Sequence, residues 1–384
     1  MSNKTIHLLK ITNYKSIDSL EVKSLGPFSV FAGPNGSGKS NFFDALDFVS
    51  TFINNGIESA LRAHGGFANI HSEKRRSEYS RKFSFEISCD LIGSQDNNEK
   101  KSSTYHYVLT IHNLDKDPKV EERLTIDGAL SMSRKMGESP VIGNNDKENS
   151  IEQFPITYSG LLLFYGLPLS ELLRNISVYR IDPIGAKEPD QSDCDPSRLD
   201  KKGHNLASVL SRLEGDRKSR ETIMDWMGMI VPGVEKIQTK HESLESKTAI
   251  MFKEQGTRKR FPAHLVSDGT VYALSMLVAA LDQPKPYGLT LIEEPERGLH
   301  PAAIRELTGM MREQSIPEMP IWLSTHSESV VRELDVQELV LVNKVDGRTR
   351  MKLAGSGGLC QESIAPLRLD EMWLSNMLDG GLPW

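Results

Sequence analysis

Alternating apolar and polar residues mark much of the first third of the chain as antiparallel β-structure. In residues 6–11, and again in 83–92, 104–112 and 119–126, apolar side chains recur at about every second position. This period places one face of a strand in a core and the other in water. A long polar segment, 93–101, serves as a hairpin tip between two of the runs. The three later runs therefore predict an antiparallel meander.

Short continuous apolar runs predict a second kind of strand, buried on both faces. Residues 28–32, 289–292 and 320–324 are runs of this kind, each too short for a helix. Strands covered on both faces are typical of a mainly parallel sheet flanked by helices. Further strands are expected at residues 234–252, 336–345 and 349–353.

Apolar residues at helical spacing alternate with these strands along the chain. Such stretches occur at residues 41–49, 161–178, 199–231 and 271–281. The third stretch stops at Val231-Pro232-Gly233, where proline and glycine end a helix. The combination of buried strands and helices predicts an α/β fold.

Residues 33–40 fill the pattern G-x-x-x-x-G-K-[ST], between a predicted buried strand and a predicted helix. Glycines let backbone N–H groups turn inward around an anion, and the helix N-terminus adds its positive end. Lys39 is expected to reach the β- and γ-phosphates, and the Ser40 hydroxyl to ligate Mg²⁺. The sequence thus predicts a nucleoside triphosphate site formed by Gly33, Pro34, Asn35, Gly36, Ser37, Gly38, Lys39, Ser40 and Asn41.

Two acids, Glu293 and Glu294, directly follow the predicted buried strand at 289–292. Adjacent carboxylates at a buried strand end are costly unless a cation or a water needs them. We expect Glu293 to lie near Mg²⁺, directly or through a water, and Glu294 to polarise the attacking water. The alternative interpretation is a solvated acidic turn.

A histidine, His326, follows the buried strand at 320–324. A lone histidine is more often structural than catalytic. Its place after a buried strand, downstream of the two acids, favours a hydrogen bond to the γ-phosphate.

Ser267-Asp268-Gly269 opens the helix predicted at 271–281. Ser267 is a good N-cap, and Gly269 lets backbone N–H groups approach an anion. Taken alone, this would be an ordinary capped helix. Because the other motifs are present as well, we interpret this helix start as a candidate anion contact.

Together these motifs resemble an ABC-type ATPase head of the RecF, SMC and OLD grouping. Within it the chain is most similar to the stand-alone "AAA family ATPases" of the AAA-21 type. Besides the motifs above, the resemblance rests on segments 11–16, 203–210, 298–301 and 380–383. It implies a mixed β-sheet lobe plus an antiparallel β subdomain, with a helical insertion. We expect an N-terminal ATPase lobe at residues 1–157, the insertion at 158–233 and a C-terminal ATPase lobe at 234–384.

The resemblance also implies a head-to-tail sandwich dimer with ATP and Mg²⁺ at its interface. In that family the signature serine of one subunit meets the γ-phosphate held by another, and Ser267 matches it. Residues 298–301 match the loop that crosses between the two sites. Asp268-Gly269-Thr270 departs from the Gly-Gly-Gln of transporter signatures. The family's Mg²⁺-coordinating glutamine is not placed, since Gln95 and Gln153 both lie in polar segments.

Composition limits the class of protein further. The 384 residues carry a formal net charge of −6, which argues against a globally basic nucleic-acid coat. Three scattered cysteines indicate a reducing compartment, and the first residues lack a signal-peptide core. The longest apolar helical stretch is too short to cross a bilayer. We therefore expect a cytoplasmic protein without a membrane partner.

The spacing of the motifs along the chain argues against the domain architectures of two related families, SMC and OLD. An SMC protein inserts long heptad arms between its halves, but strands and short helices fill the segment between Ser40 and Glu293. An OLD nuclease carries a further domain, for which the 58 residues after His326 are too few. We expect an isolated head that acts on a separate partner.

Two basic stretches are candidate nucleic-acid contacts. The first holds Lys74, Arg75, Arg76, Arg81 and Lys82; the second holds Lys253, Arg258, Lys259 and Arg260. Short charge runs are usually solvated loops, so that interpretation is the default. Contact with DNA or RNA phosphates is the alternative.

Two functions from different classes fit these features. In the first, an ATP-driven homodimer or higher homo-oligomer switches a nuclease or toxin effector, as the resemblance implies for bacterial anti-phage defence. In the second, a RecF-like DNA-repair ATPase acts directly on DNA. A transporter ATPase is a distant third, because the Gly-Gly-Gln signature is missing. We favour the first.

Overall fold

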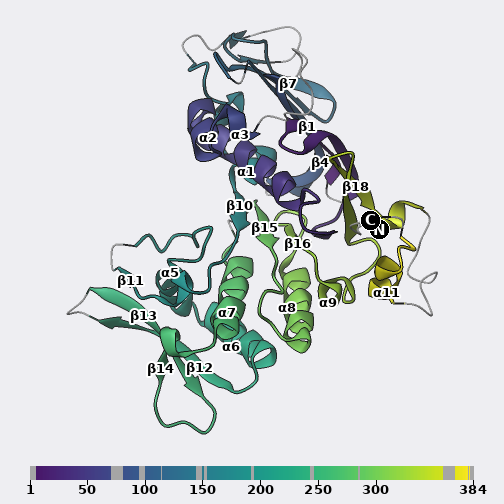
Figure 1. Cartoon of the computed structure of the whole chain (residues 1–384). Coiled ribbons are helices and arrows are strands. Elements are labelled where there is room, and N and C mark those ends of the chain that lie inside the picture. The colour runs from purple at the N-terminus through teal and green to yellow at the C-terminus, as the bar shows by residue number, and fades with distance from the viewer. Residues whose placement is uncertain are drawn as a thin grey trace.

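The structure is a computed structural model that describes residues 6–70, 81–94, 100–113, 115–143, 149–150, 154–191, 194–242, 246–283, 286–357, 368–378 and 380. Figure 1 shows an upper part, with α1–α3 beside an antiparallel sheet, and a lower part, with α5–α8 and a small sheet. Strands β10, β15 and β16 run between the two parts. Gln95, Gln153, Lys74, Arg75, Arg76 and residues 381–383 lie outside the described residues.

A six-stranded sheet connects the two parts, in the order β10-β15-β16-β3-β17-β18. Neighbours from β10 to β17 pair in parallel, and only β18 is antiparallel to its neighbour. β3 and β16 are buried along their whole length, which explains their continuous apolar sequences. The strands span Phe28–Ala32 (β3), Ile176–Tyr179 (β10), Leu289–Glu293 (β15), Ile321–Thr325 (β16), Leu339–Val345 (β17) and Arg348–Leu353 (β18).

An eight-stranded antiparallel sheet forms the upper part, in the order β2-β1-β4-β5-β6-β7-β8-β9. Alternate residues of β4 (Phe83, Phe85, Ile87 and Cys89) enter the core, as the sequence pattern predicts. The strands span Ile6–Tyr14 (β1), Ile17–Leu25 (β2), Phe83–Ser94 (β4), Lys100–His112 (β5), Lys119–Ile126 (β6), Ala129–Arg134 (β7), Val141–Ile142 (β8) and Asn149–Ser150 (β9). The predicted meander of three strands is confirmed.

Helix α1 (Lys39–Asn55) packs between the two sheets and begins at the phosphate loop. Aromatic rings fill this layer: Phe31 of β3 contacts Phe42, Phe43 and Trp322. Such ring contacts stabilise beyond the area they bury. Short helices α2 (Ile57–Ala63), α3 (Phe67–Ile70), η2 (Gly160–Leu163) and α4 (Pro168–Arg174) lie in the same part.

The lower part is built on α7 (Asp268–Leu281), which is buried almost throughout. Around it lie η3 (Gly185–Lys187), α5 (Leu206–Glu214), α6 (Arg217–Ile230), η4 (Ala263–Leu265), α8 (Pro301–Gln314) and α9 (Glu328–Val331). Helix α6 ends at Ile230, directly before the predicted stop. A small sheet closes this part, with β11 (Asp190–Gln191), β12 (Val234–Glu242), β13 (Lys247–Glu254) and β14 (Phe261–Pro262). Towards the C-terminus follow η5 (Ala354–Gly357) and α11 (Leu369–Leu374).

The expected helical stretch at 161–178 is wrong at its end. Helix α4 ends at Arg174, and the next residues form β10, a fully buried strand of the six-stranded sheet. The sequence Ile-Ser-Val-Tyr is β-branched and aromatic, which favours a strand once the parallel neighbour β15 is available. The proposed divisions near residues 157 and 233 stay predictions.

Candidate nucleotide site

The phosphate loop lies between β3 and α1, as predicted, and tight backbone packing fixes its shape. A Cβ on Gly33 would lie 2.1 Å from the carbonyl oxygen of Val342 on β17. Gly38 has φ 108°, and a Cβ there would lie 1.9 Å from the Thr349 hydroxyl of β18. Only glycine fits at either position. Asn35 and Gly36 form the exposed tip, Pro34 is half-buried and Ser37 is buried.

The Lys39 side chain lies along the inside of this loop. Its ammonium donates hydrogen bonds to the carbonyl oxygens of Gly33 (2.7 Å) and Pro34 (3.0 Å). Burial lowers the pKa of Lys39, while the negative charges of Glu294, Glu296 and Glu293 oppose that shift. The loop therefore holds one buried cation, and three carboxylates at and just after the end of β15 act on it.

Helix α1 and strand β15 bring Ser40 and Glu293 together across 253 positions of sequence. The Ser40 hydroxyl donates to Glu293 Oε2 at 3.0 Å. A hydroxyl and a carboxylate are oxygen donors of the kind Mg²⁺ takes, and Mg²⁺ commonly uses only a few protein ligands beside phosphates and waters. The predicted pair Ser40 and Glu293 thus fits this ion.

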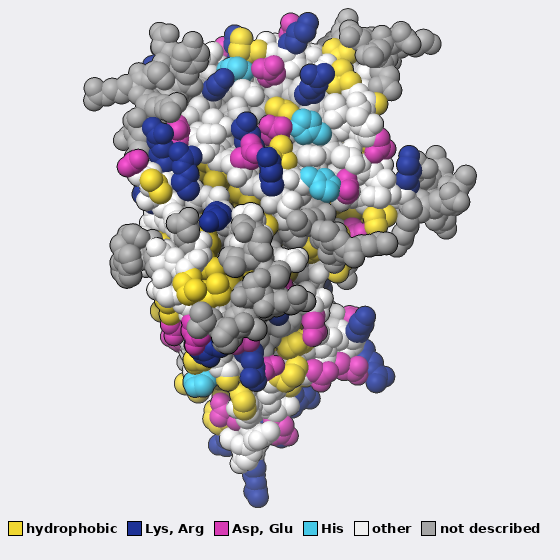
Figure 2. Space-filling view, turned by 90° about the vertical axis from the view of Figure 1, so that its right-hand side faces the viewer, with side chains coloured by type: hydrophobic (Ala, Val, Ile, Leu, Met, Phe, Trp, Pro, Cys, Tyr) yellow, Lys and Arg dark blue, Asp and Glu magenta, His cyan; other side chains and the backbone are white. Residues whose placement is uncertain are grey.

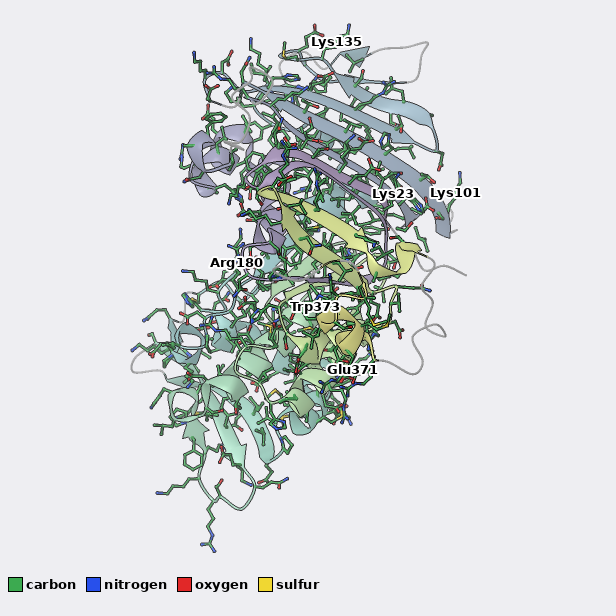
Figure 3. All side chains as sticks on the ribbon, turned by 45° about the vertical axis from the view of Figure 1, so that its right-hand side comes forward. Lys23, Lys101, Lys135, Arg180, Glu371 and Trp373 are labelled. Carbon is green, nitrogen blue, oxygen red and sulfur yellow. The ribbon has the colours of Figure 1, made fainter. Side chains whose placement is uncertain are left out.

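Arg180 is a site residue that the sequence analysis missed. It follows β10, and its guanidinium Nη2 lies 2.8 Å from Glu293 Oε1. Burial works against its charge, but the carboxylates of Glu293, Asp44 and Asp47 together raise the pKa of Arg180. Figure 3 shows Arg180 at the waist of the molecule, between the upper and lower parts. The available signal was a basic residue directly after a run that contains β-branched residues. The sequence analysis missed it because it interpreted that run as part of a helix.

Glu294 has a strained backbone, with φ 50°, where non-glycine residues are uncommon. Two hydrogen bonds hold it there: its N–H donates to the Ser324 carbonyl (2.9 Å), and its own carbonyl accepts from the Tyr272 hydroxyl (2.6 Å). Its half-exposed carboxylate lies 3.3 Å from Nδ1 of His326. The structure thus places the predicted acid and the predicted histidine in contact.

Glu296 is a second residue that the sequence analysis left without a role. Its carboxylate accepts a hydrogen bond from the Thr325 hydroxyl (2.7 Å) and one from the His326 N–H (3.3 Å). Burial raises the pKa of Glu296, and the bond from Thr325 opposes the shift. Glu296 therefore fixes the backbone on which His326 is carried.

The start of α7 lies in the lower part and is held by contacts of its own. The Ser267 hydroxyl caps the helix by accepting from the Thr270 N–H at 3.2 Å. A Cβ on Gly269 would lie 2.8 Å from the Gly298 carbonyl, so Gly269 permits close packing against segment 298–301. Lys187 of η3 pairs with Asp268 and donates to the Val266 carbonyl (2.6 Å). Among the described residues, no hydrogen bond joins Ser267 or Gly269 to residues 33–40.

Asn41 contacts the back of the loop. Its amide donates to the Ser16 hydroxyl at 2.7 Å, and Ser16 in turn lies 2.7 Å from the Thr349 hydroxyl. Thr349 donates to the Ser37 carbonyl (3.1 Å). These contacts tie the β1–β2 turn and the C-terminal hairpin to the phosphate loop. A direct contact between Asn41 and nucleotide stays a prediction.

Comparison with known proteins places this site in a family. Residues 28–332 match the model of the AAA_21 family, described as "AAA domain, putative AbiEii toxin, Type IV TA system". The chain belongs to this family. It is an ABC-type ATPase head of the RecF and SMC kind, as the motifs predict.

A solved structure has a similar fold. A crystal structure of an SMC head bound to the C-winged helix domain of ScpA superposes with a TM-score of 0.57, at 16% identity. The match covers 91% of this chain and 97% of that one. At this identity the likeness speaks for the fold alone. The predicted α/β fold with a mixed sheet and an antiparallel subdomain is confirmed.

Curated relatives are much longer than the matched regions. An uncharacterized protein, MJECL44, of Methanocaldococcus jannaschii is 30% identical over 117 residues, 30% of this chain and 33% of that protein. The chromosome partition protein Smc of the same organism is 27% identical over 150 residues, 37% of this chain and 12% of that protein. The matches thus span a third or less of these relatives. In the described part of the chain, no helix is long and apolar enough to cross a membrane.

Proposed function

We propose that this chain hydrolyses ATP and that ATP-dependent dimerisation controls a separate effector, in bacterial anti-phage defence. The observation that carries the proposal is the meeting of Lys39, Ser40, Glu293, Glu294 and His326 at one end of the parallel sheet. Catalytic and phosphate-binding groups of α/β proteins collect at the carboxyl ends of parallel strands.

Each side chain then has one task in hydrolysis. Lys39 and the inward N–H groups of residues 33–40 bind the phosphates of ATP. Ser40 and Glu293 hold Mg²⁺, which supplies neutralising charge. Glu294 accepts the proton of the attacking water, and His326, whose ring lies 3.3 Å from that carboxylate, donates to the γ-phosphate.

Ser267 and Gly269 complete the site of a second copy. Ser267 caps α7 at the surface of the lower part, and its N-terminal N–H groups suit a phosphate. In a head-to-tail pair, each subunit's Ser267 meets the nucleotide held by the other. Bound ATP then joins the two subunits, and its hydrolysis lets them separate.

The effector is proposed to be a separate nuclease or toxin. In support, the SMC head of similar fold is seen with a bound partner domain. Such a partner distinguishes the ATP-bound dimer from the separated subunits.

The test uses the wild-type chain. Light scattering after size-exclusion chromatography should show a monomer without nucleotide and a dimer with ATP and Mg²⁺, while phosphate release reports hydrolysis. Tagging the chain in its own host and identifying the co-purifying protein names the effector. A chain that neither releases phosphate nor changes its mass with ATP contradicts the proposal.

A RecF-like ATPase acting on DNA is the second candidate, favoured by the match to a chromosome partition protein. It predicts ATP-dependent binding to DNA ends or gaps by the isolated chain, with no protein partner. Comparing blunt, gapped and intact circular DNA separates it from the effector model.

A further inference from the structure

One oxygen of the Glu293 carboxylate lacks a directed partner. Oε2 accepts the hydrogen bond from the Ser40 hydroxyl, but the buried Oε1 accepts none from the described residues. Nη2 of Arg180 lies 2.8 Å from Oε1, so the two charges touch without an N–H group aligned along the contact. Most buried polar atoms in proteins have a hydrogen-bond partner. Glu293 therefore presents one oxygen that a ligand can take.

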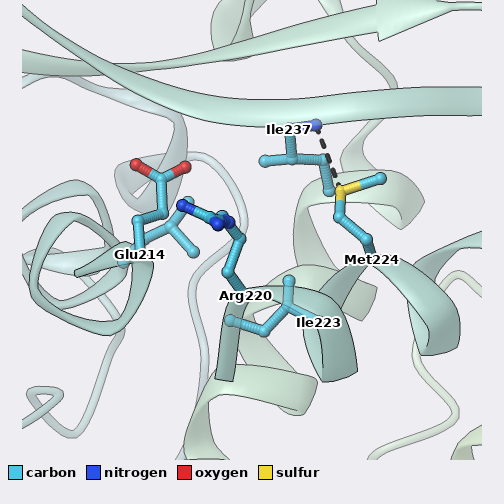
Figure 4. Close-up of a pocket in the computed structure, with 6 residues that line it drawn as sticks. Glu214, Arg220, Ile223, Met224 and Ile237 are labelled. Carbon is cyan, nitrogen blue, oxygen red and sulfur yellow. Dashed lines mark hydrogen bonds between the residues drawn. The ribbon is translucent and has the colours of Figure 1, made fainter. Parts of the chain in front are cut away.

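Glu214 of α5 shows how a carboxylate with a structural role is held in the same chain. It lines a pocket between α5, α6 and β12 (Figure 4). Its Oε1 accepts from the N–H of Thr239 at 3.1 Å, and its Oε2 accepts from the Thr239 hydroxyl at 2.6 Å. Both oxygens of Glu214 are thus satisfied by directed bonds. Glu293 differs, because one of its oxygens meets a charge alone.

Arg180 supplies that charge from a half-exposed side chain. In the part of the chain that the structure describes, Glu293 is the one ion-pair partner of its guanidinium. The backbone of Arg180 is held separately, since its N–H donates to the Lys201 carbonyl at 2.8 Å. Figure 3 shows the residue at the waist of the molecule. The side chain of Arg180 can therefore leave Glu293 while its backbone stays in place.

Two further carboxylates, Asp44 and Asp47 of α1, lie near Arg180. Their charges act with that of Glu293 to raise the pKa of Arg180. Each of the two is already paired with a lysine. Arg180 therefore remains in a negative environment after it leaves Glu293, which lowers the cost of its release.

A divalent cation suits the free oxygen of Glu293 better than a guanidinium does. Mg²⁺ is small and doubly charged, and it binds carboxylate oxygens at about 2.0–2.1 Å. The guanidinium is larger and singly charged, and it has no lone pair to offer a metal. Because two cations repel each other at close range, they compete for one carboxylate.

Distant charges have little influence on this competition. On the face drawn in Figure 2, Lys and Arg side chains lie among Asp and Glu side chains. Exposed charges more than about 10 Å apart are also screened by salt at ordinary ionic strength. The direct contact between Arg180 and Glu293 is therefore the dominant local charge interaction.

We propose that Arg180 neutralises Glu293 in the metal-free site and that Mg²⁺ displaces it from this carboxylate. Arg180 is thus a positioning residue that acts on the metal site through Glu293. The inference rests on the proposed role of Glu293 in holding Mg²⁺. Without Arg180, the nucleotide should bind more tightly with Mg²⁺, because no cation must be displaced. It should bind more weakly without metal, because the bare carboxylate repels the phosphates.

Titration with a fluorescent, non-hydrolysable ATP analogue tests this, once with saturating Mg²⁺ and once with EDTA. In Arg180→Gln the affinity should rise about two- to fivefold with Mg²⁺ and fall about two- to fivefold in EDTA, the range expected for a half-exposed ion pair. A purely structural lesion would weaken binding in both conditions. The opposite signs are therefore the readout, and they do not depend on hydrolysis.

Three further variants locate the effect. In the Glu293→Gln background, Arg180→Gln should change neither affinity, because no carboxylate is left to neutralise, whereas general repulsion of the metal would persist. Lys201→Gln removes a neighbouring cation that pairs with Asp47, and it should bind as wild type in both conditions. Arg180→Lys keeps the charge and should stay within about twofold of wild type, which controls for loss of fold.

The outcomes separate this inference from the proposed function. Weaker binding or no change in both conditions for Arg180→Gln overturns the inference, as does the same shift in the Glu293→Gln background or in Lys201→Gln. A wild type whose affinity is the same with Mg²⁺ and with EDTA refutes the metal site and this inference together. The opposite shifts in a chain that releases no phosphate from ATP refute only the proposed hydrolysis.

Discussion

The two halves of the nucleotide site are built in opposite ways. In the phosphate-loop half (residues 33–40 with Glu293, Glu294 and His326), Lys39 donates to carbonyls of its own loop, Ser40 donates to Glu293, and Glu294 contacts His326. The signature half (residues 267–269) is a single helix start, fixed from behind by Lys187 and by close packing against Gly298. The first half holds the phosphate-binding and acidic side chains, whereas the second offers only the N-terminus of a helix.

This difference suggests a separate role for each half in nucleotide binding and in dimerisation. Polar partners reduce the cost of keeping ionised groups at a strand end, so the side chains of the phosphate-loop half are positioned by contacts within one chain. A capped helix start gains most when an anion lies at its N-terminus. Mutations in the first half should therefore alter binding and turnover, and those in the second half should alter the joining of subunits.

The largest effect is expected for Lys39→Ala. It removes the buried cation of the loop, which the phosphates need as a charge-assisted donor. Nucleotide binding should be abolished in an equilibrium titration with a fluorescent ATP analogue. Lys23→Ala, an exposed lysine of β2 (Figure 3), should bind as wild type. Unchanged affinity in Lys39→Ala would sink the assignment of residues 33–40.

Glu294→Gln should come next. The amide keeps the shape of the side chain but cannot accept the proton of the water, so hydrolysis should slow at least about 100-fold. ATP should still bind, and light scattering should show accumulated dimer with ATP. Glu58→Gln, at an exposed position of α2, is the matched control. Normal hydrolysis in Glu294→Gln would place the catalytic base elsewhere.

Ser267→Arg probes the other half. A bulky cation at the helix start should block the partner's γ-phosphate, so the variant should bind ATP yet stay monomeric. Turnover should fall, but less than in Glu294→Gln because each subunit keeps its own carboxylate. Ser211→Arg makes the same change at an exposed site of α5. Full turnover in Ser267→Arg would mean that the site is not shared between subunits.

Lys187→Met should have the smallest effect. It removes a partly exposed ion pair to Asp268 and a hydrogen bond to the Val266 carbonyl. Pairs of this kind contribute little, so ATP-dependent dimer affinity should fall about two- to fivefold with ATP binding unchanged. The double variant with Asp268→Asn should cost less than the two single effects combined, because both remove one pair. Strictly additive losses would show that Lys187 does not position the signature helix.

The sequence predicted those parts of the site that are local. Residues 33–40 carry their own strand, turn and helix, and the acids Glu293 and Glu294 follow their strand directly. Arg180 was missed because its strand continues a helical pattern, and only the neighbouring β15 selects the extended form. Glu296 and Lys187 act through contacts made by folding, since Lys187 and Asp268 are 81 positions apart. No local pattern encodes such a pair.

The hydrogen bond from Thr349 to the phosphate loop can form only late in the synthesis of residues 1–384, because its two partners are far apart in sequence. It supports the Ser37 carbonyl of the phosphate loop from 312 positions further along the chain. A ribosome adds about 5–20 residues per second, so the loop waits roughly 16–60 s for that support during synthesis. The phosphate loop of a nascent chain therefore gains this support only after the signature helix, the acids and the histidine have already been made.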